Sequence, residues 1–281
     1  LVRSGLIDPF GGQADLQSGI LRAVGVPHQR FTEDALRILR LYRFAARFGF
    51  SIDPPTAQAA QELCAHLDCV SVERIEEELA KLLSAPAPAA YLDEKILGVV
   101  LRELSPEALA AAKPVVDACP AGEQALPVRL AALLLSLGED GTRRTLRRLR
   151  CSNACIEETA VLVREVVSGV PVSLNIYARR LLGKYNLCTV QRLAALGTAL
   201  QPERSADFAA LSELAEQLDA DGVCCRVSQL AVNGRDLMAA GVPAGPGIRK
   251  VLEALLDGVI REEYPNERQA LLAAVQQLAA S

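Results

Sequence analysis

Four arginines recur at every third or fourth position between Thr32 and Arg47, in a stretch that is otherwise almost entirely apolar. In an α-helix this spacing places the arginines along one side and the apolar residues along the other. Guanidinium groups form forked hydrogen bonds with phosphates and with the edges of planar groups. The four are Arg37, Arg40, Arg43 and Arg47, and Asp34 precedes the first of them. Two interpretations follow: a site for phosphate or a nucleotide, or a solvated helix face on which Asp34 pairs with Arg37.

Local signals set the expected limits of this helix. Thr32 is expected to cap its start, because a threonine hydroxyl accepts hydrogen bonds from free helical N–H groups. The proline pair in "FGFSIDPPT" is expected to end it, since proline cannot continue a helix. The apolar face is expected to contain Ala35, Ile38, Leu39, Leu41, Tyr42, Ala45, Ala46 and Phe48.

The rest of the chain predicts an all-α protein built from successive helical bundles. The 281 residues are 51% hydrophobic and 23% charged, which is typical of a globular protein. "GILRAV" is the most strand-like piece, "AQAAQELCAHL" predicts a helix, and further helices are expected to start at Ser71, Ser152–Asn153 and Gly245–Gly247. Asn233–Gly234 is expected to form a turn. No apolar run reaches the roughly 18 residues that a membrane span needs.

Charge and cysteine content narrow the classes of function. The net charge of −4 is not that of a strongly basic nucleic-acid binder, although "RRTLRRLR" could follow an RNA backbone or form a solvated helix face. The eight cysteines form no CxxC pair, and the chain has two histidines. Zinc sites need closely spaced soft ligands, so we expect no metal site and free thiols in a reducing compartment.

Three motifs together resemble one enzyme family. "DPFGG..DL" (Asp8–Leu16), "EDALRILRLYRF" (Glu33–Phe44) and "VERIEEEL" (Val72–Leu79) are similar to class II tRNA nucleotidyltransferases. That family contains CCA-adding enzymes and bacterial poly(A) polymerases. The segment from Val232 to Arg268 is similar to the end of the bacterial CCA-adding members. The likeness extends over about residues 5–83 and 230–274.

The resemblance implies a role for the arginine helix. In the family, the aspartate and first arginine of the ED-x-x-R motif pair with the incoming base, and here these are Asp34 and Arg37. Adenine and cytosine both present an amino donor beside a ring-nitrogen acceptor, which a carboxylate and a guanidinium complement. Guanine and uracil present the reverse order, which would leave polar groups unpaired. The resemblance makes Arg40 and Arg43 further nucleotide contacts, while Glu73 and Arg74 would brace this helix.

The family architecture implies four parts: a remnant of an α/β head (1–24), a neck for base recognition (25–84), a helical body (85–168) and a tRNA-binding tail (169–281). The catalytic D-x-D carboxylates that hold Mg²⁺ are expected in a missing head, so no catalytic or metal residue is assigned and the chain alone is expected to be inactive. Asp8 and Asp15 are expected to be structural. The substrates implied are ATP, CTP and tRNA, in the cytoplasm and without a membrane.

Three alternatives stay open at this point. The base-reading pair accommodates adenine in every case, so an A-adding enzyme or a poly(A) polymerase would fit it as well as CCA addition does. A helical RNA-binding module without catalytic activity would also retain the fold.

Overall fold

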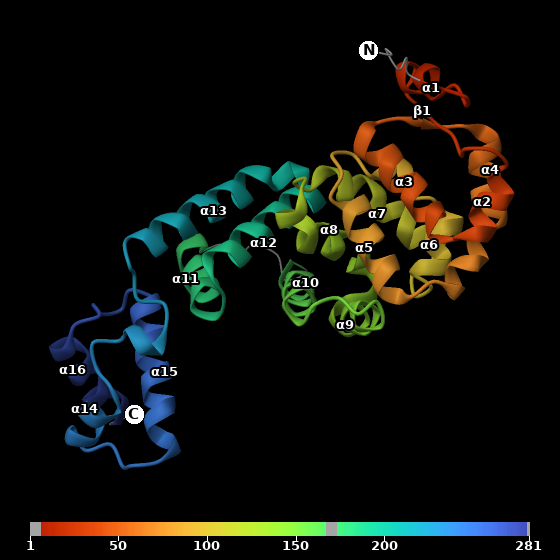
Figure 1. Cartoon of the computed structure of the whole chain (residues 1–281). Coiled ribbons are helices and arrows are strands. Elements are labelled where there is room, and N and C mark those ends of the chain that lie inside the picture. The colour runs from red at the N-terminus through yellow and green to blue at the C-terminus, as the bar shows by residue number, and fades with distance from the viewer. Residues whose placement is uncertain (1–6, 167–172, 280–281) are drawn as a thin grey trace, which may run out of the picture. The chain divides into compact units, whose positions relative to one another are not determined.

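The computed structural model describes residues 7–166 and 173–279, which contain sixteen α-helices and a sheet of two short strands (Figure 1). The predicted all-α class is confirmed. The chain divides into unit 1 (residues 1–168 and 195–202) and unit 2 (residues 169–194 and 203–281). The predicted boundary between body and tail, at residues 168 and 169, lies outside the described residues. No helix within the described ranges is long and apolar enough to cross a membrane.

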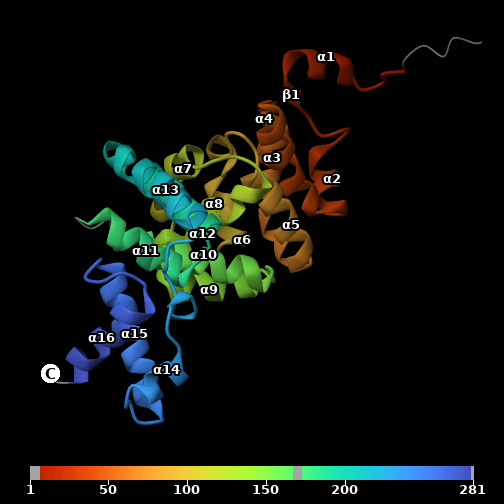
Figure 2. The ribbon, with the colours of Figure 1, turned by 90° about the vertical axis from the view of Figure 1, so that its left-hand side faces the viewer.

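The helices and strands of unit 1 come first along the chain. They are α1 (Gly12–Ser18), β1 (Ile20–Leu21), α2 (Pro27–Glu33), α3 (Leu36–Phe48), β2 (Ser51–Ile52), α4 (Pro54–Glu62), α5 (Val72–Leu83), α6 (Glu94–Val100), α7 (Pro106–Ala118), α8 (Leu126–Leu134), α9 (Gly138–Arg148) and α10 (Asn153–Val166). The arginine helix α3 packs on α5, and α10 packs on both α8 and α9 (Figure 2). The buried leucines of these helices form the core.

The strand-like segment "GILRAV" forms β1, which pairs in parallel with β2. Ile20 lies opposite Ser51, and Leu21 lies opposite Ile52. The pairing brings the two chain segments that flank α2 and α3 side by side. The sequence did not indicate β2, because a two-residue strand next to a proline pair leaves no alternating pattern to detect.

Several helix limits differ from those predicted. Thr32 does not cap α3: it lies inside α2, which Pro27 begins, and its hydroxyl donates to the carbonyl of His28 at 2.8 Å. The helix predicted at Ala57 already begins at Pro54, because the Asp53 side chain caps it through the N–H of Thr56. Phe48 does not join the core. Its side chain is 54% exposed and stacks on Phe44, with 5.9 Å between ring centroids.

Other limits agree with the sequence. Helix α5 starts directly after Ser71, and α10 starts at Asn153, where the Ser152 hydroxyl accepts a hydrogen bond from the N–H of Cys155. The turn predicted at Asn233–Gly234 is an exception, because Asn233 instead caps a helix: its side-chain oxygen accepts hydrogen bonds from the N–H groups of Arg235 and Asp236.

A fully buried arginine holds together the middle of unit 1. Arg129 on α8 has no exposed surface, and its guanidinium donates hydrogen bonds to four backbone carbonyls. These carbonyls belong to Leu83, Ala85, Pro86 and Cys119. A planar guanidinium with five donors can satisfy several acceptors at once. Arg129 therefore joins the end of α5, the chain that follows it and the end of α7.

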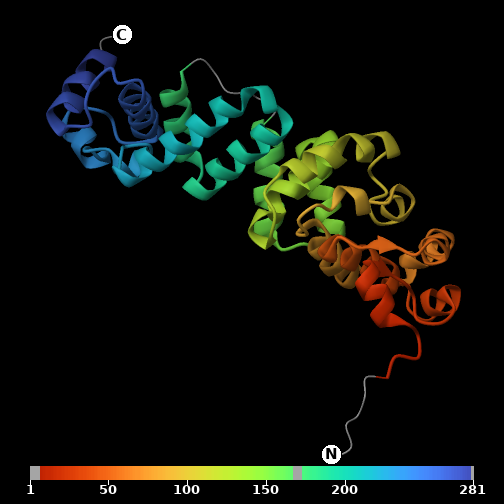
Figure 3. The ribbon, with the colours of Figure 1, turned by 90° about the horizontal axis from the view of Figure 1, so that it is seen from above.

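Unit 2 contains two groups of helices. Helix α11 (Leu174–Lys184) packs on α13 (Ser205–Ala220), and α12 (Leu187–Leu200) contributes residues to both units. Helices α14 (Gly234–Ala239), α15 (Pro246–Ile260) and α16 (Arg268–Ala279) form one bundle, drawn in blue in Figure 3. Its apolar centre consists of Cys224, Val232, Leu237, Leu255, Val259, Leu271, Ala274 and Val275.

Replacing Gly183 by alanine should destabilise unit 2. A β-carbon at this position of α11 would lie 2.5 Å from the carbonyl oxygen of Cys225, so backbone must move. We expect a loss of about 1–3 kcal/mol in the free energy of unfolding. Gly98→Ala is the matched control, because that helical glycine has open space and alanine should stabilise its helix by about 0.5–1 kcal/mol. If the thermal unfolding temperature shifted equally in both variants, the close approach of Gly183 to the carbonyl of Cys225 would be contradicted.

Candidate functional site

The chain breaks between α2 and α3 at Asp34. This residue is extended, with φ −151° and ψ 102°, so it does not lie on the arginine helix as the spacing suggested. Its Oδ1 accepts a hydrogen bond from the N–H of Leu36 at 3.1 Å, in the first turn of α3. The carboxylate therefore lies at the end of α3 where unpaired N–H groups favour negative charge.

Asp34 and Arg37 do not form the ion pair that their spacing suggested. Arg74 Nη2, from α5, lies 3.1 Å from Asp34 Oδ2. Arg37 Nη1 instead lies 2.7 Å from Glu33 Oε2 and donates to the carbonyl of Arg30 at 3.1 Å. Hydrogen bonds from Arg37 and Arg30 hold the pKa of Glu33 below its usual range. Each of the two predicted base-reading side chains is thus held by a separate protein partner.

A buried carboxylate on α5 orients the next two arginines. Glu78 is 4% exposed and lies 3.1 Å from Arg40 Nε and 2.8 Å from Arg43 Nε. Arg43 also lies over the ring of Phe44, 4.0 Å from its centroid, where the ring face attracts a cation. Helix α5 therefore supports α3 through Glu78 as well as through Arg74.

The sequence predicted that Glu73 and Arg74 brace the arginine helix, and it did not indicate Glu78. Arg74 does contact Asp34, whereas Glu73 pairs with Arg150. A signal for Glu78 was available, because it follows Ile75 by three residues and precedes Leu82 by four. That spacing puts a carboxylate on the apolar stripe of α5, and a buried carboxylate requires a charged or hydrogen-bonding partner.

Glu78→Gln should lower the stability of unit 1 by about 1–3 kcal/mol, because a neutral amide keeps the shape but removes the buried counter-charge of two arginines. Chemical unfolding followed by circular dichroism would measure the loss. Glu77→Gln is the control, because Glu77 is exposed and forms an ion pair with Lys81 one turn away, an arrangement with about 0.3–0.5 kcal/mol of stabilisation. Equal stability of the two variants would show that Glu78 does not hold the arginines.

A pocket of about 420 Å³ opens beside these arginines, between the segment after β1 and helices α2 and α3. Its lining residues are Leu21, Arg22, Ala23, Val24, Arg30, Phe31, Arg37, Arg40, Leu41 and Phe44. It thus combines four arginines with an apolar and aromatic wall, and no acid lines it. Such a lining suits a planar ligand that carries negative charge. Arg37 and Arg40 line this pocket, whereas Asp34 and Arg43 do not.

The aspartates of the first motif have structural partners. Asp8 accepts hydrogen bonds from the N–H groups of Gly12 and Gln13, at 2.7 and 2.8 Å. These two bonds hold the pKa of Asp8 below its usual range. Asp15 lies 2.9 Å from Arg22. No group of three or more metal-binding side chains occurs among the described residues.

Acidic partners hold three arginines of the "RRTLRRLR" run. Arg143 contacts Glu139 and Glu157, Arg148 contacts Glu103, and Arg150 contacts Glu73. These contacts favour a structural role for those three. Arg144 and Arg147 are exposed on α9 and remain suited to an anionic surface.

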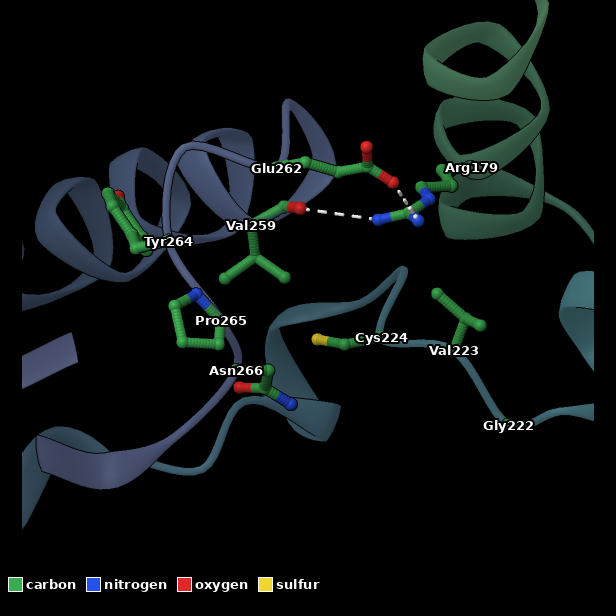
Figure 4. Close-up of a pocket in the computed structure, with 9 residues that line it drawn as sticks. All are labelled: Arg179, Gly222, Val223, Cys224, Val259, Glu262, Tyr264, Pro265 and Asn266. Carbon is green, nitrogen blue, oxygen red and sulfur yellow. Dashed lines mark hydrogen bonds and ion pairs between the residues drawn. The ribbon is translucent and has the colours of Figure 1, made fainter. Parts of the chain in front are cut away.

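Unit 2 has a hollow of about 510 Å³ between α11 and the end of α15 (Figure 4). Arg179 is its only charged donor, and it already lies 2.6 Å from Glu262 and donates to the carbonyl of Val259. The Asn266 amide also has protein partners: it donates to the carbonyl of Gln229 and accepts from the N–H of Ala231. Arg179 therefore joins α11 to the end of α15, and Asn266 joins the segment after α15 to the segment before α14.

Two family models match the chain. One describes tRNA nucleotidyltransferase domain 2 and matches residues 128–275. The other is described as "Probable RNA and SrmB- binding site of polymerase A" and matches residues 49–106. The first match alone covers more than half of the chain.

Curated relatives and solved structures agree with these matches. The CCA-adding enzyme of Lactiplantibacillus plantarum is 32% identical over 274 residues, which are 95% of this chain and 65% of that protein. That of Levilactobacillus brevis is 33% identical, over 96% of this chain and 67% of its own. The chain thus spans about two thirds of the length of these relatives.

The crystal structure of the Bacillus stearothermophilus CCA-adding enzyme in complex with CTP has a TM-score of 0.81. It shares 26% identity over 98% of this chain and 69% of that one. The Thermotoga maritima CCA-adding enzyme complexed with tRNA, at 19% identity and a TM-score of 0.66, supports the fold. The ED-x-x-R segment packs against α5, and a family model matches residues 128–275. The chain therefore belongs to the tRNA nucleotidyltransferase family.

Proposed function

We propose that this chain provides base selection and tRNA binding in an enzyme that adds C, C and A to the 3′ ends of tRNA from CTP and ATP. The observation that carries the proposal is the arrangement around α3. Asp34 is held by Arg74, Arg37 is held by Glu33, and Arg37 and Arg40 line a cationic pocket with an aromatic wall. Nucleotide ligands combine the planar base and the negative charge that this pocket suits.

Base selection follows from the donors and acceptors of the two side chains. The Asp34 carboxylate accepts from an exocyclic amino group, and the Arg37 guanidinium donates to the neighbouring ring nitrogen. Cytosine and adenine offer this pair in the same order. Guanine and uracil place a carbonyl and a ring N–H there, so the mismatched groups would lose about 1–3 kcal/mol for each unpaired bond. Arg40 and Arg43 are assigned to the ribose–phosphate side of the nucleotide.

The division of labour along the chain belongs to the same proposal. Residues 1–24 would complete a head domain, 25–84 would form the neck that reads the base, 85–168 the body, and 169–281 the tail that binds tRNA. The described residues offer no cluster suited to Mg²⁺, so no metal-dependent step is assigned to them. The relatives named as CCA-adding enzymes favour CCA addition over A addition or poly(A) synthesis. We place the enzyme in the cytoplasm, where its tRNA substrate would be found.

A reconstituted enzyme tests the proposal. The amino-terminal part of the B. stearothermophilus relative would be joined to this chain, and incorporation would be followed on tRNA that lacks its terminal CCA. We expect C, C and A to be added in order. Addition of A only, or of many A residues, would identify the two alternative enzymes. The absence of any incorporation, together with unimpaired tRNA binding by the chain alone, would favour an RNA-binding module instead.

A further inference from the structure

Arg30, on α2, contacts both the wall of the arginine pocket and the two residues assigned to base reading. Its Nε donates to the carbonyl of Val24 at 2.9 Å, and a β-carbon on Gly25 would lie 3.7 Å from its Nη2. The carbonyl of Arg30 accepts from the N–H of Asp34 at 3.3 Å and from Arg37 Nη1 at 3.1 Å. Arg30 therefore connects the segment after β1, which lines the pocket, with the start of α3.

The side chain of Arg30 also reaches Arg37 through a shared carboxylate. Arg30 Nη1 lies 3.1 Å from each oxygen of Glu33, and Arg37 Nη1 lies 2.7 Å from Glu33 Oε2. The bonds from Arg37 and Arg30 hold the pKa of Glu33 below its usual range, so this carboxylate is charged at neutral pH. The two acceptors of Arg37 Nη1 are thus the carbonyl of Arg30 and a carboxylate that Arg30 holds.

These contacts form a connected network rather than an isolated surface pair. The side chains of Arg30, Glu33 and Arg37 are each between 42% and 47% exposed, and a single pair with that exposure adds little stability. Here the bonds run without a gap from the carbonyl of Val24 through Arg30 and Glu33 to Arg37. Charged hydrogen bonds with several partners fix the direction of a guanidinium even where they stabilise the fold only slightly.

We propose that Arg30 is a positioning residue for base selection, which directs the Arg37 guanidinium toward the base by holding Glu33. The inference rests on the function proposed above, and it assigns Arg30 no contact with the base. A hydrogen bond weakens steeply when its donor turns away from the acceptor. A misdirected Arg37 would therefore bind cytosine and adenine less well, whereas uracil and guanine have no acceptor there to lose.

Single-turnover incorporation by the joined enzyme tests this role. Arg30→Ala keeps the carbonyl but frees Glu33, so we expect selectivity for CTP over UTP to fall about threefold to tenfold. Arg30→Lys should restore part of it, because an ammonium can bond Glu33 but cannot also reproduce the fork that reaches Val24. Lys81→Ala is the matched control, since Lys81 is also 44% exposed in an ion pair and should leave selectivity unchanged.

A double variant separates positioning from direct binding, because Arg30 itself lines the pocket. If Arg30 acts through Arg37, adding Arg30→Ala to Arg37→Ala should lower selectivity no further. An Arg30 that instead bound the phosphates would raise KM by the same factor for all four nucleotides and leave the selectivity of Arg30→Ala unchanged. That result, or losses that add in the double variant, would overturn the proposal.

Hydrogen exchange of guanidinium protons, followed by NMR on the chain without the added part, provides a measurement that needs no activity. The protons of Arg37 should exchange at least about threefold faster in Arg30→Ala than in the unaltered chain, and those of Arg47 should not change. Arg30→Lys replaces Arg30→Ala in this measurement if the alanine variant folds poorly. Unchanged exchange of the Arg37 protons would overturn the positioning role, whereas an unaltered joined enzyme without activity would count against the proposed function alone.

Discussion

Replacing Arg129 by methionine should lower the free energy of unfolding of unit 1 by about 3–5 kcal/mol. Methionine fills much of the same volume, but it has no donor for the carbonyls of Leu83, Ala85, Pro86 and Cys119. Three buried acceptors and the partly buried carbonyl of Pro86 would then lose a charged partner at once, and buried carbonyls without partners are costly. Arg129→Lys should show an intermediate loss, because an ammonium group cannot reproduce the planar fork of donors.

Hydrogen exchange provides the local measurement for this variant, because two units need not unfold together. Amides of α5 and α8 should exchange faster in Arg129→Met than in the unaltered chain. Arg144→Met is the matched control: Arg144 is exposed on α9, and its loss should change stability by less than about 0.5 kcal/mol. If the amides of α5 and α8 exchange at the same rate in both variants, the hydrogen bonds from Arg129 to the four carbonyls do not stabilise these helices.

Alanine at Asp34 or Arg37 should weaken discrimination between bases. On the proposed function, each substitution removes one of the two bonds that distinguish cytosine and adenine from uracil and guanine. We expect selectivity for CTP and ATP over UTP and GTP to fall roughly tenfold to a hundredfold, which corresponds to about 1–3 kcal/mol. Incorporation of CTP and ATP should also slow, because the correct base loses a partner.

Single-turnover incorporation by the joined enzyme would measure this selectivity. Asp34→Asn adds a sharper test, because its amide can turn an N–H group toward the carbonyl of a wrong base. Arg47→Ala is the control, since Arg47 is exposed at the far end of the same helix. Base selectivity that stays unchanged in the Asp34 and Arg37 variants would exclude the proposed reading of the base.

The sequence predicted the helical class, the strand at "GILRAV" and the starts of α5, α10 and α15, because each has a strong local signal. It failed where two local signals competed. Thr32 is a residue type that often caps a helix, but Pro27 is a stronger start signal. The helix therefore begins at Pro27, and Thr32 lies within it. Periodicity also placed Phe48 in the core, although this residue is largely exposed and its ring packs on the rings of Phe44 and Phe50.

Only part of the candidate site could be predicted from the sequence, and the reason is different. Spacing within one helix indicated Arg37, Arg40 and Arg43, but it could not show what holds them. The partners Arg74 and Glu78 come from α5, about forty positions later in the chain, and only the packing of α5 on α3 brings them close. The spacing also placed Asp34 on the arginine helix, because counting by helical periodicity assumes that the helix continues through every position. The backbone of Asp34 is extended instead.

Arginine side chains that move freely have about 2 kcal/mol of rotamer entropy, which a ligand removes when it binds them. In this chain Arg37 is restricted in advance, because its Nη1 is bonded to Glu33 and to the carbonyl of Arg30. The loss of motion thus accompanies folding, and little of it is left for binding. On the proposed function, a base would meet a donor edge whose direction is already fixed. The same rigidity would prevent Arg37 from adjusting to a base with the wrong pattern, so that selectivity would come from restricted motion as much as from attraction.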